Sequence, residues 1–110
     1  MVAPPVSLQL AGSVQTQSER LGLYQLVPQK LVNNRPVWRA EDGADHWLAF
    51  TDIGWMVQSE KSLGSITGWI SSLDEQSPSP DRTTTGWREV SSGKFVDAPG
   101  LRCFDDAFCA

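Results

Sequence analysis

The residues of this chain that could support general acid–base chemistry are its single histidine, His46, and the acidic residues just before it, Glu41, Asp42 and Asp45. Asp45 and His46 are neighbours in a predicted strand, where adjacent side chains point to opposite faces. We therefore do not expect the pair to share a site, and we interpret His46 as a partly exposed residue at a strand end. The sequence contains no GxSxG, HExxH, GxGxxG or P-loop motif. These observations favour a non-catalytic protein, with an enzyme that uses an unrecognised site as the remote alternative.

The segment "AEDGADH", residues 40–46, places several possible oxygen ligands close together. It lacks the residue order of a calcium-binding EF-hand loop. We interpret it as an acidic hairpin turn and predict neither a metal site nor a cofactor.

Two cysteines, Cys103 and Cys109, lie in the C-terminal segment "LRCFDDAFCA" with five residues between them. This spacing fits neither a CxxC redox pair nor a four-ligand zinc site. It favours a disulfide that pins the C-terminal tail, with two free thiols as the alternative. A loop this short would contribute only about 2–3 kcal/mol to stability.

The five tryptophans are first of all candidates for the core, because each can bury on the order of 200 Å² of apolar surface. The stretch 32–57 carries more aromatic and charged side chains than one buried face of a sheet requires. We therefore expect its hairpin ends, together with the loop 72–86, to form a recognition surface. The candidate ligand-binding residues are Arg35, Trp38, Arg39, Asp42, Asp45, His46 and Trp55.

Arginines near these aromatic residues have two possible roles. Arg35, Arg39 and Arg88 are expected to lie against aromatic rings in cation–π contacts. The alternative is that they bind a carboxylate of a ligand.

The elements that must position these residues are strands, because apolar residues recur at every second position. Turn signals separate the apolar segments at short intervals. The sequence predicts an all-β fold, a small antiparallel sandwich or barrel-like meander of about seven to nine short strands. One helix of two turns is a competing possibility within residues 13–22. The expected strands cover residues 6–11, 22–27, 35–40, 46–51, 54–59, 66–71, 85–90, 94–97 and 100–103.

The length of 110 residues suits a single domain, residues 1–110, with a core over about 6–103 and a tail at 104–110. The net charge of -4 and the scattered basic residues exclude nucleic acid as an expected partner. No apolar run is long enough for membrane insertion, and we expect a mature chain in a secreted, extracellular or organelle-lumen setting. The predicted core residues are Leu8, Leu23, Val37, Leu48, Phe50, Val57 and Ile70, with most of the tryptophans.

The recurring motif GxY…VNxRPVWR…WLxF…GWMV…GWIxS…W…FVxAPxLxC covers residues 6–103. It resembles a short Trp-rich β module of large multidomain proteins from algae, other protists and some marine invertebrates. One departure is Asn33-Asn34, where the module has Asn-Gly in the turn. The resemblance implies a small all-β accessory module without catalytic activity.

The sequence thus predicts a recognition module that binds carbohydrate or a protein partner through aromatic and loop residues. The alternative is a small acidic structural or docking subunit of a larger assembly. A ligand-binding module should leave aromatic residues in a groove, whereas a docking subunit should show a broad apolar patch. The oligomeric state is left open.

Overall fold

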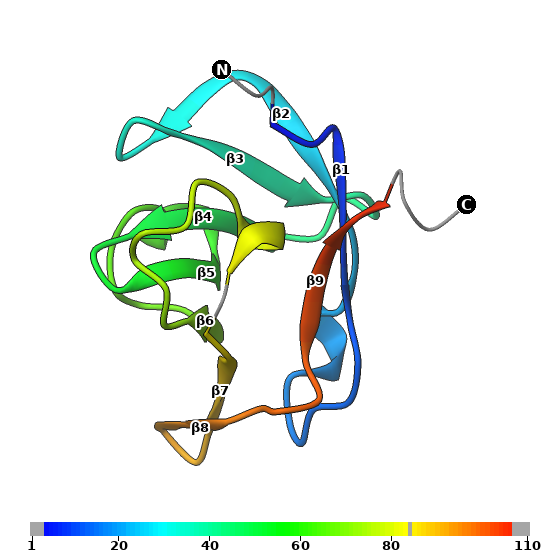
Figure 1. Ribbon diagram of the computed structural model, residues 1–110, viewed down its shortest axis with the longest axis vertical. Helices are drawn as coiled ribbons and strands as arrows, with labels where there is room; N and C mark the ends of the chain where they lie inside the picture. The colour runs from blue at the N-terminus through cyan, green and yellow to red at the C-terminus, as the bar shows by residue number, and fades with distance from the viewer. Residues whose placement is uncertain (1–3, 84, 107–110) are drawn as a thin grey trace.

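The computed structural model describes residues 4–83 and 85–106, and within them nine strands form one antiparallel sheet that curls into a half-barrel (Figure 1). The first eight strands are neighbours in chain order, and β9 pairs with β1. The all-β prediction is confirmed. The strands are β1 Ser7–Ala11, β2 Gly22–Val32, β3 Arg35–Ala40, β4 Trp47–Thr51, β5 Gly54–Gln58, β6 Ile70–Ser72, β7 Trp87–Ser91, β8 Lys94–Asp97 and β9 Arg102–Asp105.

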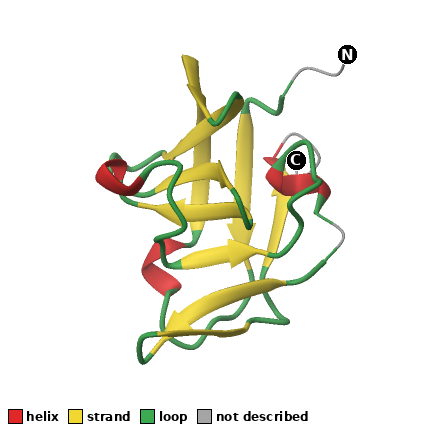
Figure 2. Ribbon diagram, turned by 90° about the vertical axis from the view of Figure 1, so that its left-hand side faces the viewer, coloured by secondary structure: helices red, strands yellow, loops and turns green. Residues whose placement is uncertain are grey.

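Helical structure in the described part of the chain is limited to three 3-10 turns (Figure 2). They are η1 (Ser18–Arg20), η2 (Glu60–Ser62) and η3 (Pro80–Arg82). The helix considered for residues 13–22 is thus reduced to the single turn η1, since that segment has almost no apolar face to bury.

The tight hairpins follow from residues that tolerate positive φ. Asn33 and Asn34, with φ of 53° and 65°, form the turn between β2 and β3. Ser92 and Gly93, with φ of 53° and 80°, form the turn between β7 and β8. Two consecutive positive φ angles match the twist of antiparallel strands, so these local residues fix the register of both hairpins.

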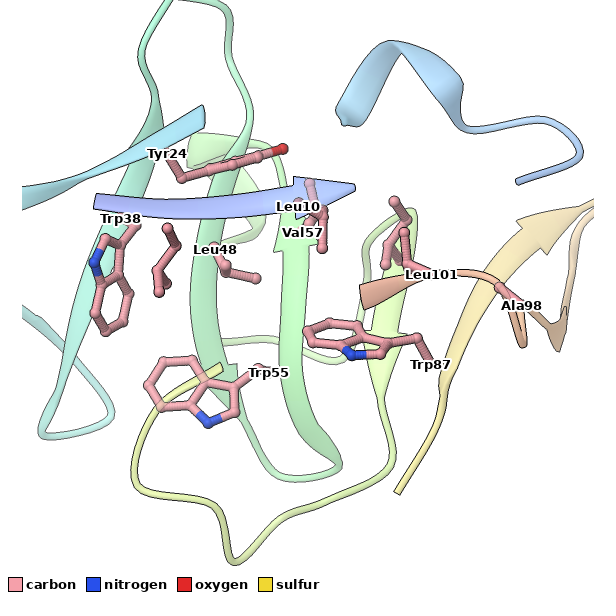
Figure 3. Packing of buried hydrophobic residues seen from close by; sticks show 11 residues of the cluster. Leu10, Tyr24, Trp38, Leu48, Trp55, Val57, Trp87, Ala98 and Leu101 are labelled. Atoms are coloured by element: carbon pink, nitrogen blue, oxygen red, sulfur yellow. The ribbon is translucent and has the colours of Figure 1, made fainter. Parts of the chain in front are cut away.

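The main core fills the concave side of the sheet, where Trp38, Trp55 and Trp87 point inward from three different strands (Figure 3). The rings of Trp38 and Trp55 lie 5.6 Å apart in an edge-to-face arrangement. Four predicted core residues, Leu8, Leu48, Val57 and Ile70, are fully buried in this cluster.

A second, smaller core lies on the opposite face of the sheet and contains Val37, Trp47 and Ala49. It is covered by Val27 and Val32 of the long strand β2 and by Leu63 beyond η2. The predicted core residue Val37 is therefore buried on this outer side, while Leu23 and Phe50 are only partly buried. Because both faces are covered, all five residues of β5 are buried.

Two strands depart clearly from the predicted bounds. β2 continues five residues beyond the expected 22–27, and of the strand expected at 66–71 only residues 70–72 pair as β6. The preceding segment, residues 59–69, folds back instead. The side-chain amide of Gln58 donates hydrogen bonds to the carbonyls of Ser65 (3.1 Å) and Thr67 (2.8 Å). Its carbonyl accepts one from the Gly64 N–H (2.8 Å).

The C-terminal disulfide is not supported by the structure. Cys103 is a free, partly buried cysteine on β9, and Cys109 lies outside the described residues. Burial, with a smaller contribution from the negative charge of Asp81, raises the pKa of the Cys103 thiol. Within the described residues, no helix is long and apolar enough to cross a membrane.

Candidate functional site

A hollow of about 560 Å³ opens where β2 begins and β3 ends, next to η1. We call it the acidic hollow, because three carboxylates from Glu19, Glu41 and Asp42 surround it. Its apolar lining comes mainly from Leu21, Leu23 and Ala40, and the remaining lining residues are Gln9, Gly22, Tyr24 and His46.

The β3–β4 turn carries Glu41 and Asp42 and holds the Asp42 carboxylate in place. Asp42 accepts a hydrogen bond from the Ala44 N–H (2.9 Å), and Gly43 has a φ of 83°. This Asx-type turn presents exposed acidic side chains beside the hollow. The N–H of Glu41 donates to the carbonyl of Leu23 (2.9 Å), which ties the turn to the start of β2.

His46 lines the hollow and contacts Trp69 in a T-shaped arrangement, with ring centroids 5.4 Å apart. The guanidinium of Arg20 lies 4.1 Å from the centroid of the Trp69 ring. Burial and, secondarily, the positive charge of Arg20 lower the pKa of His46, against the weaker pull of nearby carboxylates. The imidazole is therefore neutral at pH 7. Arg20 also pairs with Glu19 (3.3 Å), and Glu41 and Asp42 keep the net charge of the acidic hollow negative.

The inner wall of the hollow includes Tyr24, whose side chain is fully buried. Its hydroxyl donates a hydrogen bond to the backbone carbonyl of Arg20. Burial raises the pKa of Tyr24, although the Arg20 charge acts in the opposite direction. Tyr24 thus joins η1 to the sheet as a neutral phenol.

Two of the seven predicted site residues, Asp42 and His46, line this hollow. Asp45 instead accepts hydrogen bonds from the Trp47 indole N–H and the Glu60 backbone N–H, both at 2.9 Å. The bond from Glu60 is the main reason that the pKa of Asp45 is lowered. As the sequence predicted, Asp45 and His46 have different surroundings.

The predicted arginines have structural contacts. The guanidinium carbon of Arg39 lies 4.9 Å from the Trp47 ring centroid, and that of Arg35 lies 4.8 Å from the Phe50 centroid. These cation–π contacts match the prediction for both residues. Arg88 differs, because it pairs with Asp97 at 3.2 Å.

Trp38 and Trp55 were predicted to contact a ligand, but the structure places both in the core, where each is 0% exposed. The Trp38 indole N–H donates to the Pro5 carbonyl (2.8 Å), and the Trp55 indole N–H donates to the Ser77 carbonyl (3.1 Å). A ligand cannot reach either ring while the core is closed.

The residues of the expected recognition surface are divided between the two ends of the sheet. Arg35 begins β3 and Asp42 follows its end, so the six-residue strand separates them by roughly 17–20 Å. The loop 72–86 follows β6, whose end lies against Gly54, opposite the end with the acidic hollow. The structure therefore places the described residues of this loop, 72–83 and 85–86, and Arg35 away from Asp42 and His46.

The residues that the argument for this site uses but that were not among the predicted ligand-binding residues include Glu19, Arg20, Tyr24, Glu41 and Trp69. The helix considered for 13–22 and the aromatic residue in "GLYQLV" were the available signals. Neither signal indicates that η1 meets the β3–β4 turn, because that contact depends on strand pairing. Among the described residues, no group of three or more His, Cys, Asp and Glu is arranged to hold a metal ion.

Comparison with protein-family models, curated proteins and solved structures found no match to this chain. The resemblance to the Trp-rich β module therefore depends on the sequence motif alone.

Proposed function

We propose that this protein is a non-catalytic recognition module that binds a basic segment of a protein partner in the acidic hollow. The observation that carries this proposal is the placement of Glu19, Glu41 and Asp42 around an apolar lining. An ammonium or guanidinium group can pair with the carboxylates while its aliphatic stem covers the apolar surface. Arg20 pairs with Glu19 (3.3 Å), so Glu41 and Asp42 supply most of the free negative charge, and the neutral His46 does not offset it.

The burial of the tryptophans favours a protein partner over carbohydrate, which is the other class of ligand that the sequence predicted. Sugar rings stack on exposed aromatic faces. Four of the five tryptophans are buried, and Trp69 is partly buried and already contacts Arg20 and His46. The hollow therefore offers charge to a ligand more readily than it offers a stacking surface.

The test is isothermal titration calorimetry with a short peptide of alternating lysine and alanine and with its glutamate counterpart. We expect only the lysine peptide to bind. The double variant Glu41→Gln/Asp42→Asn should weaken binding at least tenfold. The amide oxygen introduced by Asp42→Asn can still accept the hydrogen bond from the Ala44 N–H, so the turn itself should be preserved.

The matched control is Glu60→Gln/Glu75→Gln, which removes the same charge from exposed positions outside the hollow. Equal affinities of both double variants would contradict the proposed site. Binding of a neutral oligosaccharide in place of the peptide would favour the carbohydrate alternative.

A docking subunit remains the second candidate, and one observation favours it. An apolar groove of about 370 Å³ is lined mainly by Leu26, Val27 and Leu31 with three prolines, and Leu31 is 64% exposed. Such apolar exposure is typical of protein interfaces. Leu31→Lys should release a docked partner in a pull-down and leave binding of the lysine peptide unchanged.

A further inference from the structure

Glu89, on β7, is a buried residue that is only 1% exposed. Its carboxylate is surrounded by hydrogen-bond donors. It accepts bonds from the backbone N–H groups of Gln15 (2.8 Å), Thr16 (2.8 Å) and Gln17 (3.2 Å). The Thr16 hydroxyl lies 3.0 Å from the same carboxylate and 2.7 Å from the Val90 carbonyl. We call residues 13–17 the connector, because they lead from β1 to η1.

These bonds join parts of the sheet that strand pairing leaves apart. The connector follows β1, whereas β7 is next to the opposite edge of the nine-stranded sheet. The Gln17 side-chain amide adds a bond to the Val90 carbonyl (2.9 Å). Glu89 therefore closes the curled sheet at the connector through side-chain bonds rather than through a β-ladder.

The connector also supports one wall of the acidic hollow. Directly after it, η1 provides Glu19, and Leu21 follows as an apolar lining residue. Arg20 in η1 rests on Trp69, and its carbonyl accepts the Tyr24 hydroxyl. Residues 15–17 therefore lie only a few residues from this wall along the backbone.

We propose that Glu89 is an acid-sensitive closure whose protonation releases the connector and loosens the η1 wall of the acidic hollow. A carboxylate can accept all of these donors, but a carboxylic acid carries its own donor and faces three N–H groups. Protonation thus removes acceptor capacity from the group that holds three backbone N–H groups, which weakens the attachment of the connector to β7. The consequence for partner binding rests on the proposed function, while the release of the connector does not.

The charged groups around Glu89 are few. Asp97 lines the same 350 Å³ hollow beside Glu89, and it is paired with Arg88. The cross-strand neighbours of Glu89, Ile70 on β6 and Val96 on β8, are uncharged. Burial alone would raise the pKa of Glu89, but the hydrogen bonds from the connector outweigh it and lower the pKa below 4.5. The closure therefore persists in mild acid and is lost as pH falls through that lowered value.

Amide hydrogen exchange, resolved by NMR and corrected for intrinsic rates, tests the closure. Glu89→Gln reproduces the neutral form with nearly the same shape. We expect the amides of Gln15, Thr16 and Gln17 to lose protection at least tenfold at pH 7, while the amides of β4 and β5 remain protected. Wild-type protein should show the same selective loss only below pH 4.5. Asp97→Asn, a matched neighbouring change, should leave the connector protected.

Unchanged protection in Glu89→Gln, or an equal loss in Asp97→Asn, would overturn the proposal. If Glu89→Gln does not fold, Thr16→Val removes one donor, and its connector should lose protection at a higher pH than wild type. The lysine peptide separates the two proposals. If Glu89→Gln opens the connector without changing peptide affinity, the link to the hollow is wrong. If wild-type protein binds no peptide, the proposed function fails and the exchange result still decides on the closure.

Discussion

At the scale of single residues, four basic side chains lie against three aromatic rings. Lys30 and Arg39 both lie over the Trp47 ring, at 5.8 and 4.9 Å from its centroid. Arg20 covers Trp69 and Arg35 covers Phe50. Each contact is worth about 0.5–1 kcal/mol at exposed sites, and each uses a cation that could otherwise bind a ligand. Part of the surplus of aromatic and basic residues in the sequence therefore serves intramolecular contacts rather than ligand binding.

Core tryptophans give the first prediction. Trp38→Ala and Trp55→Ala should each reduce the free energy of unfolding by about 3–5 kcal/mol, because the lost ring leaves a cavity in a fully buried cluster. Urea denaturation followed by circular dichroism measures the loss. A loss below about 1 kcal/mol in either variant would show that the ring is not a core element. Binding of the lysine peptide should be unchanged in whatever fraction remains folded.

The single histidine gives the second prediction. An NMR pH titration should report a pKa for His46 below the ordinary 6.5, because burial and Arg20 disfavour the charged imidazole. The unfolded chain then binds the proton more tightly than the folded protein. The contribution of His46 to stability is complete above pH 6.5 and is lost as pH falls from 6.5 through the lowered pKa. A measured pKa at or above 6.5 would contradict this environment, and His46→Gln should flatten the stability profile in this range.

At the scale of elements, the segment 59–69 determines how the outer face of the sheet is covered. Gln58 is fully buried and binds this segment through both ends of its side-chain amide. Asp45 adds a further attachment, because its carboxylate accepts the Glu60 N–H. Polar side chains therefore attach this segment to β4 and β5, in addition to the packing of Leu63 on the second core.

Replacement of that amide gives the third prediction. Gln58→Leu should cost about 2–4 kcal/mol of stability, because backbone groups of residues 64, 65 and 67 lose their buried partners. Chemical denaturation measures the cost, and hydrogen exchange should show increased exposure confined to the segment 59–69. Gln25→Leu, at an exposed strand position, is the control and should change stability by less than about 0.5 kcal/mol. Similar effects of the two substitutions would mean that Gln58 does not anchor the segment.

At the scale of the whole molecule, a net charge of -4 acts together with the local carboxylates of the acidic hollow. Negative potential of this kind speeds the approach of a basic partner and is screened by salt. The same charge makes association with acidic surfaces unfavourable. The overall electrostatics and the local site thus favour the same class of partner.

Salt dependence gives the fourth prediction. The affinity of the lysine peptide should fall about tenfold or more between 50 and 500 mM sodium chloride, because the pairing groups of the hollow are partly or fully exposed to solvent. Titration calorimetry at both salt concentrations measures the change. An affinity independent of salt would indicate that apolar contacts, rather than carboxylates, hold the peptide.

Strands and hairpins were predictable from the sequence because their causes are local. Alternating residues form β3 and β8 at the predicted bounds, and Asn33-Asn34 makes a turn that needs only its own φ angles. The strand expected at 66–71 was too long because the hydrogen bonds of Gln58 to the folded-back segment compete with pairing. The strand propensity of residues 66–71 does not include these hydrogen bonds, because Gln58 lies outside that segment.

The sequence by itself determined an all-β chain whose aromatic residues exceed the needs of one buried face, and it singled out the acidic turn beside His46. Only the tertiary structure decided that Trp38 and Trp55 are sealed in the core and that η1 meets this turn to form the acidic hollow. The physical reason is the curl of the sheet. Local residues set which side chains share a face, but the curl decides which face is closed and which distant segments meet at its end.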